Sequence, residues 1–191
     1  MTSTTDILGH QVALNLLLDD APAQEPMLRE IFRGMADIIN GAAAKWSAEQ
    51  AEVFRLTNEL TIFRVVQYGT MRLTRSFMAQ KERVFYWAFD EFIKWEPAKR
   101  RPTAYFHDAW HVHQYLTQGP APNDDKILID REQDAIAQQL EVAGIVGCDQ
   151  SMIDWLTAYA EDRQRIKERL SSGLGMSGTP GALQEHFLIL E

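Results

Sequence analysis

The sequence predicts a mainly α, single-domain helical protein with little or no sheet, and three observations carry this prediction. Apolar residues recur at spacings of three and four along much of the chain, and turn signals are few. Residues 47–95 contain no proline and a single glycine, Gly69. The length of 191 residues suits one domain with a sizeable core. We expect that domain to span residues 1–170, followed by a Gly/Ser-rich tail or packing arm at 171–191.

The helices are expected in the following order. Residues 7–18 form a weakly amphipathic first helix, and a second helix begins near Pro26 and stops at Asn40-Gly41. Ser47 is a plausible N-cap for the next segment, which extends to Trp95. This segment is expected to form one very long helix, or two helices with a break around residues 78–82. The aromatic end of that segment, residues 84–95, is helical and buried, or it forms a homo-oligomer interface. The C-terminal tail is the other candidate for such an interface.

Further helices are expected at residues 104–118, 130–143 and 149–170. The basic run from Lys99 to Arg101 lies between Pro97 and Pro102, so we interpret it as a solvated linker.

Composition excludes several classes of partner. Hydrophobic residues make up 46% and charged residues 24%, which is typical of a globular protein. A net charge of −8 argues against nucleic acid, because phosphate binding needs a basic surface. No apolar stretch approaches the roughly 20 residues that span a bilayer, and the N-terminus lacks signal-peptide features. The single cysteine, Cys148, fits a reducing compartment, so we expect a cytoplasmic protein without a membrane partner.

The segment "YFHDAWHVHQYL", residues 105–116, holds three of the five histidines. Helical geometry separates them into two groups. The core stripe, within about 40° on the helix, comprises Tyr105, Ala109, Val112 and Leu116. The nearly opposite face carries His107, His111 and Gln114, whereas His113 lies close to the core stripe.

A histidine pair at i and i+4 off the core stripe can place two imidazole nitrogens around one metal ion. Asp108 follows the first histidine. In HExxH metallopeptidases that position holds the carboxylate that takes a proton from metal-bound water. "HDAWH" is therefore the zinc signature with Asp108 in place of glutamate, and it predicts a Zn²⁺ site.

The next expected helix, "IDREQDAIAQQLEVAG", offers candidates for a third metal ligand. Glu132 lies about 60° from the centre of its apolar stripe, whereas Asp130 and Asp134 lie at about 100° to 140°. An acid that borders a buried face needs a partner, which a metal, an arginine or a histidine can supply.

The combination of "HDAWHVHQ" with "EQDAIA" resembles bacterial zincin-like metallopeptidases, which carry HExxHxxQ followed by ExDAxA. The resemblance covers residues 105–140. It implies that His107, His111 and Glu132 bind zinc and that Asp108 acts as the general base. Gln114 and Asp134 would hold the ligands in position without binding the metal themselves. A different alignment makes Asp130 the third ligand.

The same resemblance implies a zinc peptidase acting on a peptide or protein substrate, with a two-helix metal core. Two departures stand out. Asp108 is one methylene shorter than glutamate, and the β-sheet that zincins place beside the first helix has little signal upstream.

Two other functions fit the same residues. One is a non-catalytic helical binding or assembly protein. The other is a di-iron carboxylate bundle, in which Asp108 and His111 replace a Glu-x-x-His pair and Glu52, Glu59 and Glu132 add carboxylates. Such a bundle needs two ligand pairs, and the sequence offers one.

Overall fold

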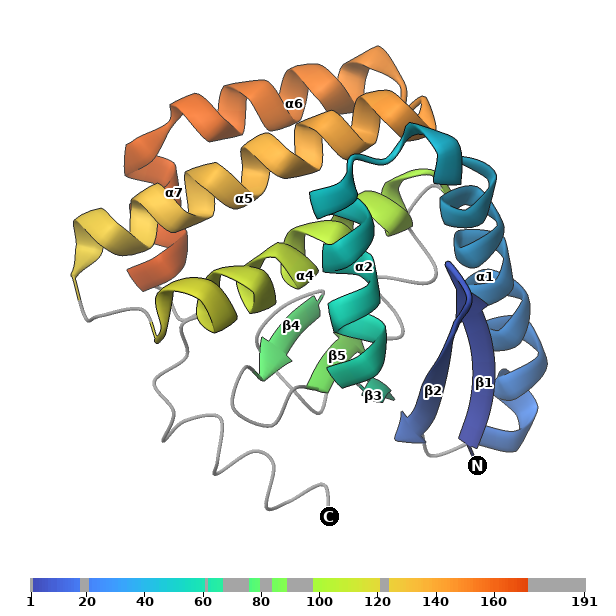
Figure 1. Cartoon of the computed structure of the whole chain (residues 1–191). Helices are drawn as coiled ribbons and strands as arrows, with labels where there is room; N and C mark the ends of the chain where they lie inside the picture. The colour runs from blue at the N-terminus through green and yellow to red at the C-terminus, as the bar shows by residue number, and fades with distance from the viewer. Residues whose placement is uncertain are drawn as a thin grey trace.

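The computed structural model describes residues 2–17, 21–60, 62–66, 76–79, 84–88, 98–120 and 124–171. Most of them are helical (Figure 1), which confirms the mainly α prediction. The helices are α1 (Ala21–Gly41), α2 (Ala48–Leu60), α4 (Arg100–Gln118), α5 (Asp125–Val146), α6 (Gln150–Glu161) and α7 (Arg163–Ser171), with a short 3₁₀ turn, η1 (Ala43–Lys45). Among the described residues, no helix is both long enough and apolar enough to cross a membrane.

A five-stranded sheet corrects the expectation of little or no sheet. Its strands are β1 (Thr2–Ile7), β2 (His10–Leu17), β3 (Ile62–Val66), β4 (Ser76–Ala79) and β5 (Val84–Ala88). They are ordered β1-β2-β3-β5-β4. The three central strands, β2, β3 and β5, run parallel, and the two edge strands, β1 and β4, are antiparallel to their neighbours.

The helix predicted at residues 7–18 is wrong, because this segment belongs to a β-hairpin. The turn residues Leu8 and Gly9 have φ values of 53° and 83°. Two consecutive positive φ values are typical of a type I′ turn, whose twist matches that of paired strands. The backbone N–H of Leu8 donates to Asn40 at 2.7 Å, which fixes the hairpin to the end of α1.

The long helix predicted from residue 47 is correct only in its first part. Ser47 caps α2 as expected: its Oγ accepts from the backbone of Gln50 at 3.1 Å, and the Gln50 side chain accepts from the backbone of Ser47 at 3.0 Å. This reciprocal pair is a capping box. The helix ends at Leu60, and strands follow. Residues 84–88 of the aromatic segment form β5 rather than a helix, and the rest of that segment lies outside the described residues.

The C-terminal half of the molecule is helical, as predicted, with different boundaries. Lys99 is the N-cap of α4 and Arg100 begins it, so the basic run is a helix start rather than a linker. The helix predicted at residues 149–170 is divided at Asp162 into α6 and α7. The tail predicted at 171–191 lies beyond the described residues, except for Ser171 at the end of α7.

Two apolar clusters hold α4 and α5 in place. In the first, Phe54 of α2 packs against Tyr105 and Phe106 of α4, with ring centroids 5.9 and 4.8 Å apart. The second joins α5, α6 and α7. Figure 1 shows α4 between the sheet and α5, and α4 contacts both α5 and β4. The α4–α5 pair therefore lies at the centre of the fold.

Candidate metal centre

The local sequence explains why both helices of the candidate site form. Helix α4 buries Tyr105, Ala109 and Val112, the core stripe predicted from helical spacing. Leu116, the last member of that stripe, is 39% exposed near the end of the helix. Asp124 is the N-cap of helix α5, and its carboxylate accepts from two backbone N–H groups; Gly147, in the left-handed conformation, is the C-cap.

The side chains of His107 and His111 on α4 meet Glu132 on α5. The Nε2 atoms of the two histidines are 3.2 Å apart. His111 Nε2 lies 3.2 Å from Glu132 Oε2, and His107 Nε2 lies 3.7 Å from Glu132 Oε1. Taking one donor atom from each residue, all three lie within 4.8 Å of one another. This group can hold a metal ion.

The distance between the two Nε2 atoms and the distance from His111 to Glu132, each 3.2 Å, are close to those required by a tetrahedral ion, whereas the 3.7 Å from His107 is measured to the other carboxylate oxygen. Zinc–nitrogen and zinc–oxygen bonds of about 2.0–2.1 Å at tetrahedral angles place neighbouring ligand atoms about 3.4 Å apart. His111 and Glu132 are buried, and His107 is partly accessible, with 14% of its side chain exposed. Two of these separations therefore approach the spacing of a metal site, and His107 is the most accessible of the three residues.

Gln114 determines the tautomer of His111. The Gln114 amide nitrogen donates to the backbone carbonyl of Arg131 and to Asp134, each at 2.9 Å. Its oxygen must then accept, and it lies 2.9 Å from His111 Nδ1. The proton of a neutral His111 is thereby placed on Nδ1, which leaves the Nε2 lone pair directed at Glu132 and His107, as a metal ligand requires.

Asp134 anchors this arrangement from α5. Its Oδ2 accepts from Gln114 and from the indole N–H of Trp110, the latter at 2.6 Å. The resemblance to zincins implied supporting positions for both Gln114 and Asp134, and the structure places them behind His111. Trp110 was not identified from the sequence. The sequence shows only that the indole N–H of a tryptophan on this helix requires a hydrogen-bond acceptor if the side chain is buried.

The electrostatics of the group favour a cation between the ligands. Burial lowers the pKa of His111, but the hydrogen bond and charge of Glu132, with the charge of Asp108, raise it overall. Burial raises the pKa of Glu132, and the two histidines outweigh this effect, so it lies well below its usual range. A proton on His111 can compensate the buried carboxylate, and a metal ion can take over that role.

Asp108 is 3% exposed and follows His107 on α4. Its negative charge contributes to the raised pKa of His111, which places the carboxylate within electrostatic reach of the ligand group. A buried carboxylate next to a candidate metal ligand is a candidate for a functional role.

The remaining candidate ligands lie elsewhere. Asp130, the alternative third ligand, is exposed and forms an ion pair with Arg163 at 2.8 Å. His113 lies 3.6 Å from Glu49 and packs on Trp110, away from the ligand group, as its place near the core stripe predicted. Glu52, suggested for a di-iron site, pairs with Arg55. The Glu59 side chain lies outside the described residues.

No protein-family model matches this chain, and neither the curated proteins nor the solved structures compared with it include a match.

Proposed function

We propose that the protein is a zinc-dependent metallohydrolase, and most specifically a peptidase. The observation that carries this proposal is the convergence of His107, His111 and Glu132 from two helices at separations of 3.2 to 3.7 Å. Two imidazoles and one carboxylate form the ligand set of one class of catalytic zinc site, in which a fourth position is left for water. The partly accessible His107 lies on the side from which substrate would enter.

The metal would supply Lewis acidity and lower the pKa of a bound water. Asp108 would take the proton of that water on its carboxylate and later deliver it to the leaving amine. Its position after His107 puts it on the same turn of α4 as the first ligand. Gln114 would keep His111 in the ligating tautomer throughout the reaction.

The order of the secondary structure also supports a zincin-like centre. Strands β3, β4 and β5 precede α4 in the chain, and β4 contacts it. A sheet beside the first metal-binding helix is what the resemblance to zincins implied. The proposal therefore combines a local ligand group with the expected neighbouring sheet.

Elemental analysis of the purified protein tests the proposal. We expect one zinc per chain, lost in His107→Ala and in His111→Ala and retained in His113→Ala, the matched control on the same helix. About two irons per chain would instead indicate a di-iron centre. Absence of bound metal after dialysis against zinc would favour a non-catalytic binding or assembly protein. Equal metal content in all three variants would refute the ligand assignment.

A further inference from the structure

Helix α7 packs on the N-terminal half of α5, the half that carries the candidate ligand Glu132 (Figure 1). Ile166 of α7 is fully buried and belongs to the same apolar cluster as Ile129 and Ile136 of α5. Those two isoleucines lie three residues before and four residues after Glu132, so the three side chains share one side of α5. Arg169 follows Ile166 by three residues and therefore lies on the side of α7 that faces α5.

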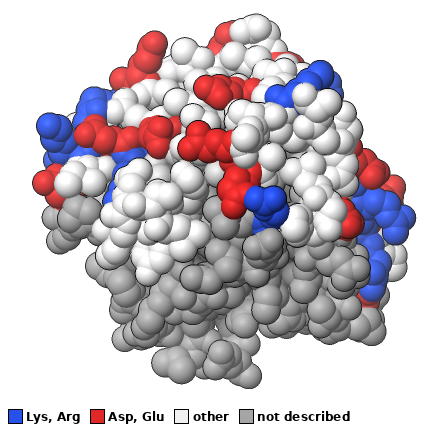
Figure 2. Space-filling model, in the orientation of Figure 1, with Lys and Arg blue, Asp and Glu red and all other residues white. Residues whose placement is uncertain are grey.

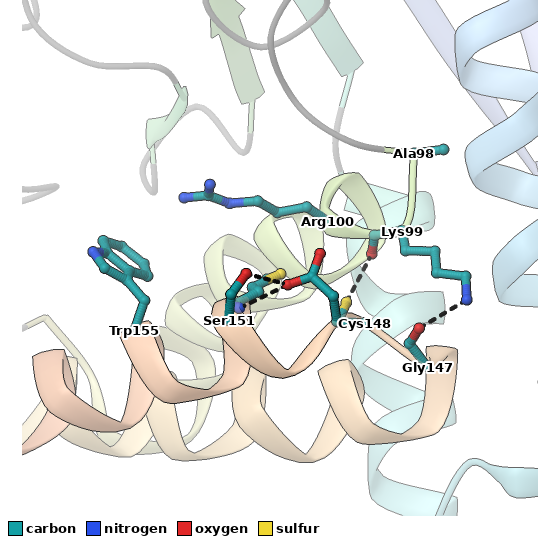
Figure 3. Close-up of a pocket in the computed structure, with 9 residues that line it drawn as sticks. Ala98, Lys99, Arg100, Gly147, Cys148, Ser151 and Trp155 are labelled. Atoms are coloured by element: carbon teal, nitrogen blue, oxygen red, sulfur yellow. Dashed lines mark hydrogen bonds between the residues drawn. The ribbon is translucent and has the colours of Figure 1, made fainter.

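Tyr159, near the end of α6, holds the Arg169 guanidinium in place. Its hydroxyl accepts from Arg169 Nη1 at 3.3 Å, and the guanidinium lies over the tyrosine ring, 5.6 Å from the ring centroid. The ring is buried and stacks on Trp155, with the two centroids 5.7 Å apart. Trp155 in turn lines a cavity of about 610 Å³ between the start of α4 and the α5–α6 junction, where Figure 3 shows it on α6. A ring fixed on one side in this way gives the guanidinium a defined position.

The pair of Tyr159 and Arg169 lies beside Glu132. Gln133 donates from its side-chain amide to the backbone carbonyl of Ala160 at 2.7 Å, so the residues that follow Glu132 and Tyr159 in the chain are in direct contact. Burial raises the pKa of Tyr159, and the charge of Glu132 contributes to this increase. Packing and electrostatics therefore agree that this carboxylate is close to the pair.

Zinc would cancel the negative charge that Arg169 faces. Burial lowers the pKa of Arg169, but Tyr159 and the negative charges of Glu132 and Asp108 raise it overall. Both carboxylates are buried, so Arg169 is attracted to them in the metal-free protein. A zinc ion adds two positive charges to the same group of residues and removes this attraction. A cation that stabilises only the metal-free state lowers the affinity for the metal.

We propose that Arg169 is the counter-ion of the metal-free site and that it lowers the affinity of the site for zinc, with Tyr159 holding it in position. The inference rests on the proposed metal centre and does not require that the protein be a peptidase. Arg169 acts on the metal through the charges of Glu132 and Asp108, so it is a positioning residue rather than a ligand.

Zinc affinity tests this inference when it is measured by competition with a chromophoric chelator. We expect Arg169→Gln to bind zinc about threefold to tenfold more tightly than the native protein, as for the loss of one nearby positive charge. Arg169→Lys keeps the charge and should bind zinc within about twofold of the native protein. Lys167→Gln is the matched control: it removes an exposed cation of α7 that pairs with Asp125 at 3.0 Å, and it should also change the affinity by less than about twofold.

Two further measurements separate electrostatics from general damage to the fold. After treatment with a chelator, Arg169→Gln should unfold at a lower urea concentration than the native protein, because the two carboxylates lose their counter-ion. A purely structural role of Arg169 would instead weaken the metal-free fold and zinc binding together. An increase in NaCl from about 0.05 M to about 0.5 M should reduce the difference in zinc affinity, because dissolved ions screen the charge of Arg169.

Several results would overturn the inference. Weaker or unchanged zinc binding by a folded Arg169→Gln protein would do so, and circular dichroism verifies the fold of each variant. An equal change in Lys167→Gln would assign the effect to net charge rather than to the position of Arg169. Failure of the native protein to bind zinc would overturn both this inference and the proposed metal centre. Zinc binding without peptide hydrolysis would overturn the peptidase alone and leave the inference intact.

Discussion

Gln114 lies one turn after His111 on α4, and its amide oxygen faces His111 Nδ1 at 2.9 Å. Both donors of the same amide are used, one by the Arg131 carbonyl and one by Asp134. The orientation of the amide is therefore fixed from α5, and with it the tautomer of a candidate metal ligand on α4.

Gln114→Ala should weaken zinc binding by about 10- to 100-fold, because His111 loses the acceptor that keeps its Nε2 free for the metal. Competition with a chromophoric chelator measures this affinity. Gln133→Ala is the matched control: it removes a glutamine on α5 that bonds to Ala160 and Arg163. A loss of zinc affinity equal in both variants would indicate general destabilisation rather than ligand orientation.

Asp108→Asn should reduce peptide hydrolysis by about 10²- to 10⁴-fold while zinc remains bound, because asparagine cannot take the proton of the water. Turnover with a fluorogenic peptide and metal content are measured on the same preparation. Asp108→Glu supplies the carboxylate that zincin-like proteins have here and should keep activity above that of the asparagine variant. Unchanged turnover in Asp108→Asn would refute the general-base role.

The metal-free protein should have a stability maximum that depends on His111 and Glu132. The pKa of His111 is raised in the folded state, so its contribution is full below pH 6.5 and is lost as pH rises through the raised value. The pKa of Glu132 is lowered, so its contribution is full above pH 4.5 and is lost as pH falls through the lowered value. Both contributions are full between these two pH values.

Urea unfolding of the chelator-treated protein between about pH 3 and pH 9 measures this dependence. Glu132→Gln removes the charge that raises the pKa of His111, so it should flatten the curve above pH 6.5. A curve of the same shape in the variant would show that other groups cause the pH dependence. Zinc should bind more weakly as pH falls, because protons compete for the imidazoles.

Ser47→Ala should lower the free energy of unfolding by about 1 kcal/mol, because the backbone N–H of Gln50 loses its acceptor at the start of α2. The change is measured by urea denaturation at neutral pH. Ser151→Ala serves as a comparison, since its hydroxyl bonds to the Asp149 side chain while Asp149 itself caps α6. A larger loss from Ser151→Ala than from Ser47→Ala would contradict this assignment of the caps.

The sequence predicts the candidate site better than it predicts the fold. His107, His111 and Gln114 are related by helical spacing alone, and Glu132 lies on the next helix, so a local pattern is sufficient to find them. The strands β3 and β5 are five-residue runs in which every residue except Arg64 is apolar or aromatic, and such runs do not distinguish a buried strand from a buried helix. Their pairing depends on partners far away in the chain.

The hairpin and the start of α4 also could not be predicted from local sequence patterns. The type I′ turn uses Leu8-Gly9 instead of the more usual Asn-Gly, so the residues gave no turn signal. Arg100 looked like part of a solvated linker because Trp155, on which it lies, is 55 positions later in the chain. Contacts of this kind arise from tertiary packing, which periodicity does not reveal.

Basic and acidic side chains are unevenly distributed on the face drawn in Figure 2. Acidic side chains form a broken band across the described part of the molecule, and basic ones occur in separate groups at the left, at the right and beside the acidic side chains in the middle.

The ligand atoms all come from a short stretch of chain, because His107 and Glu132 belong to consecutive helices of the fold. A cross-link across so small a loop costs little chain entropy, whereas the sheet must bring together strands from residues 2 to 88. A bound metal would therefore nucleate the α4–α5 hairpin before the parallel strands find their register. We expect zinc to accelerate refolding as well as to stabilise the native state.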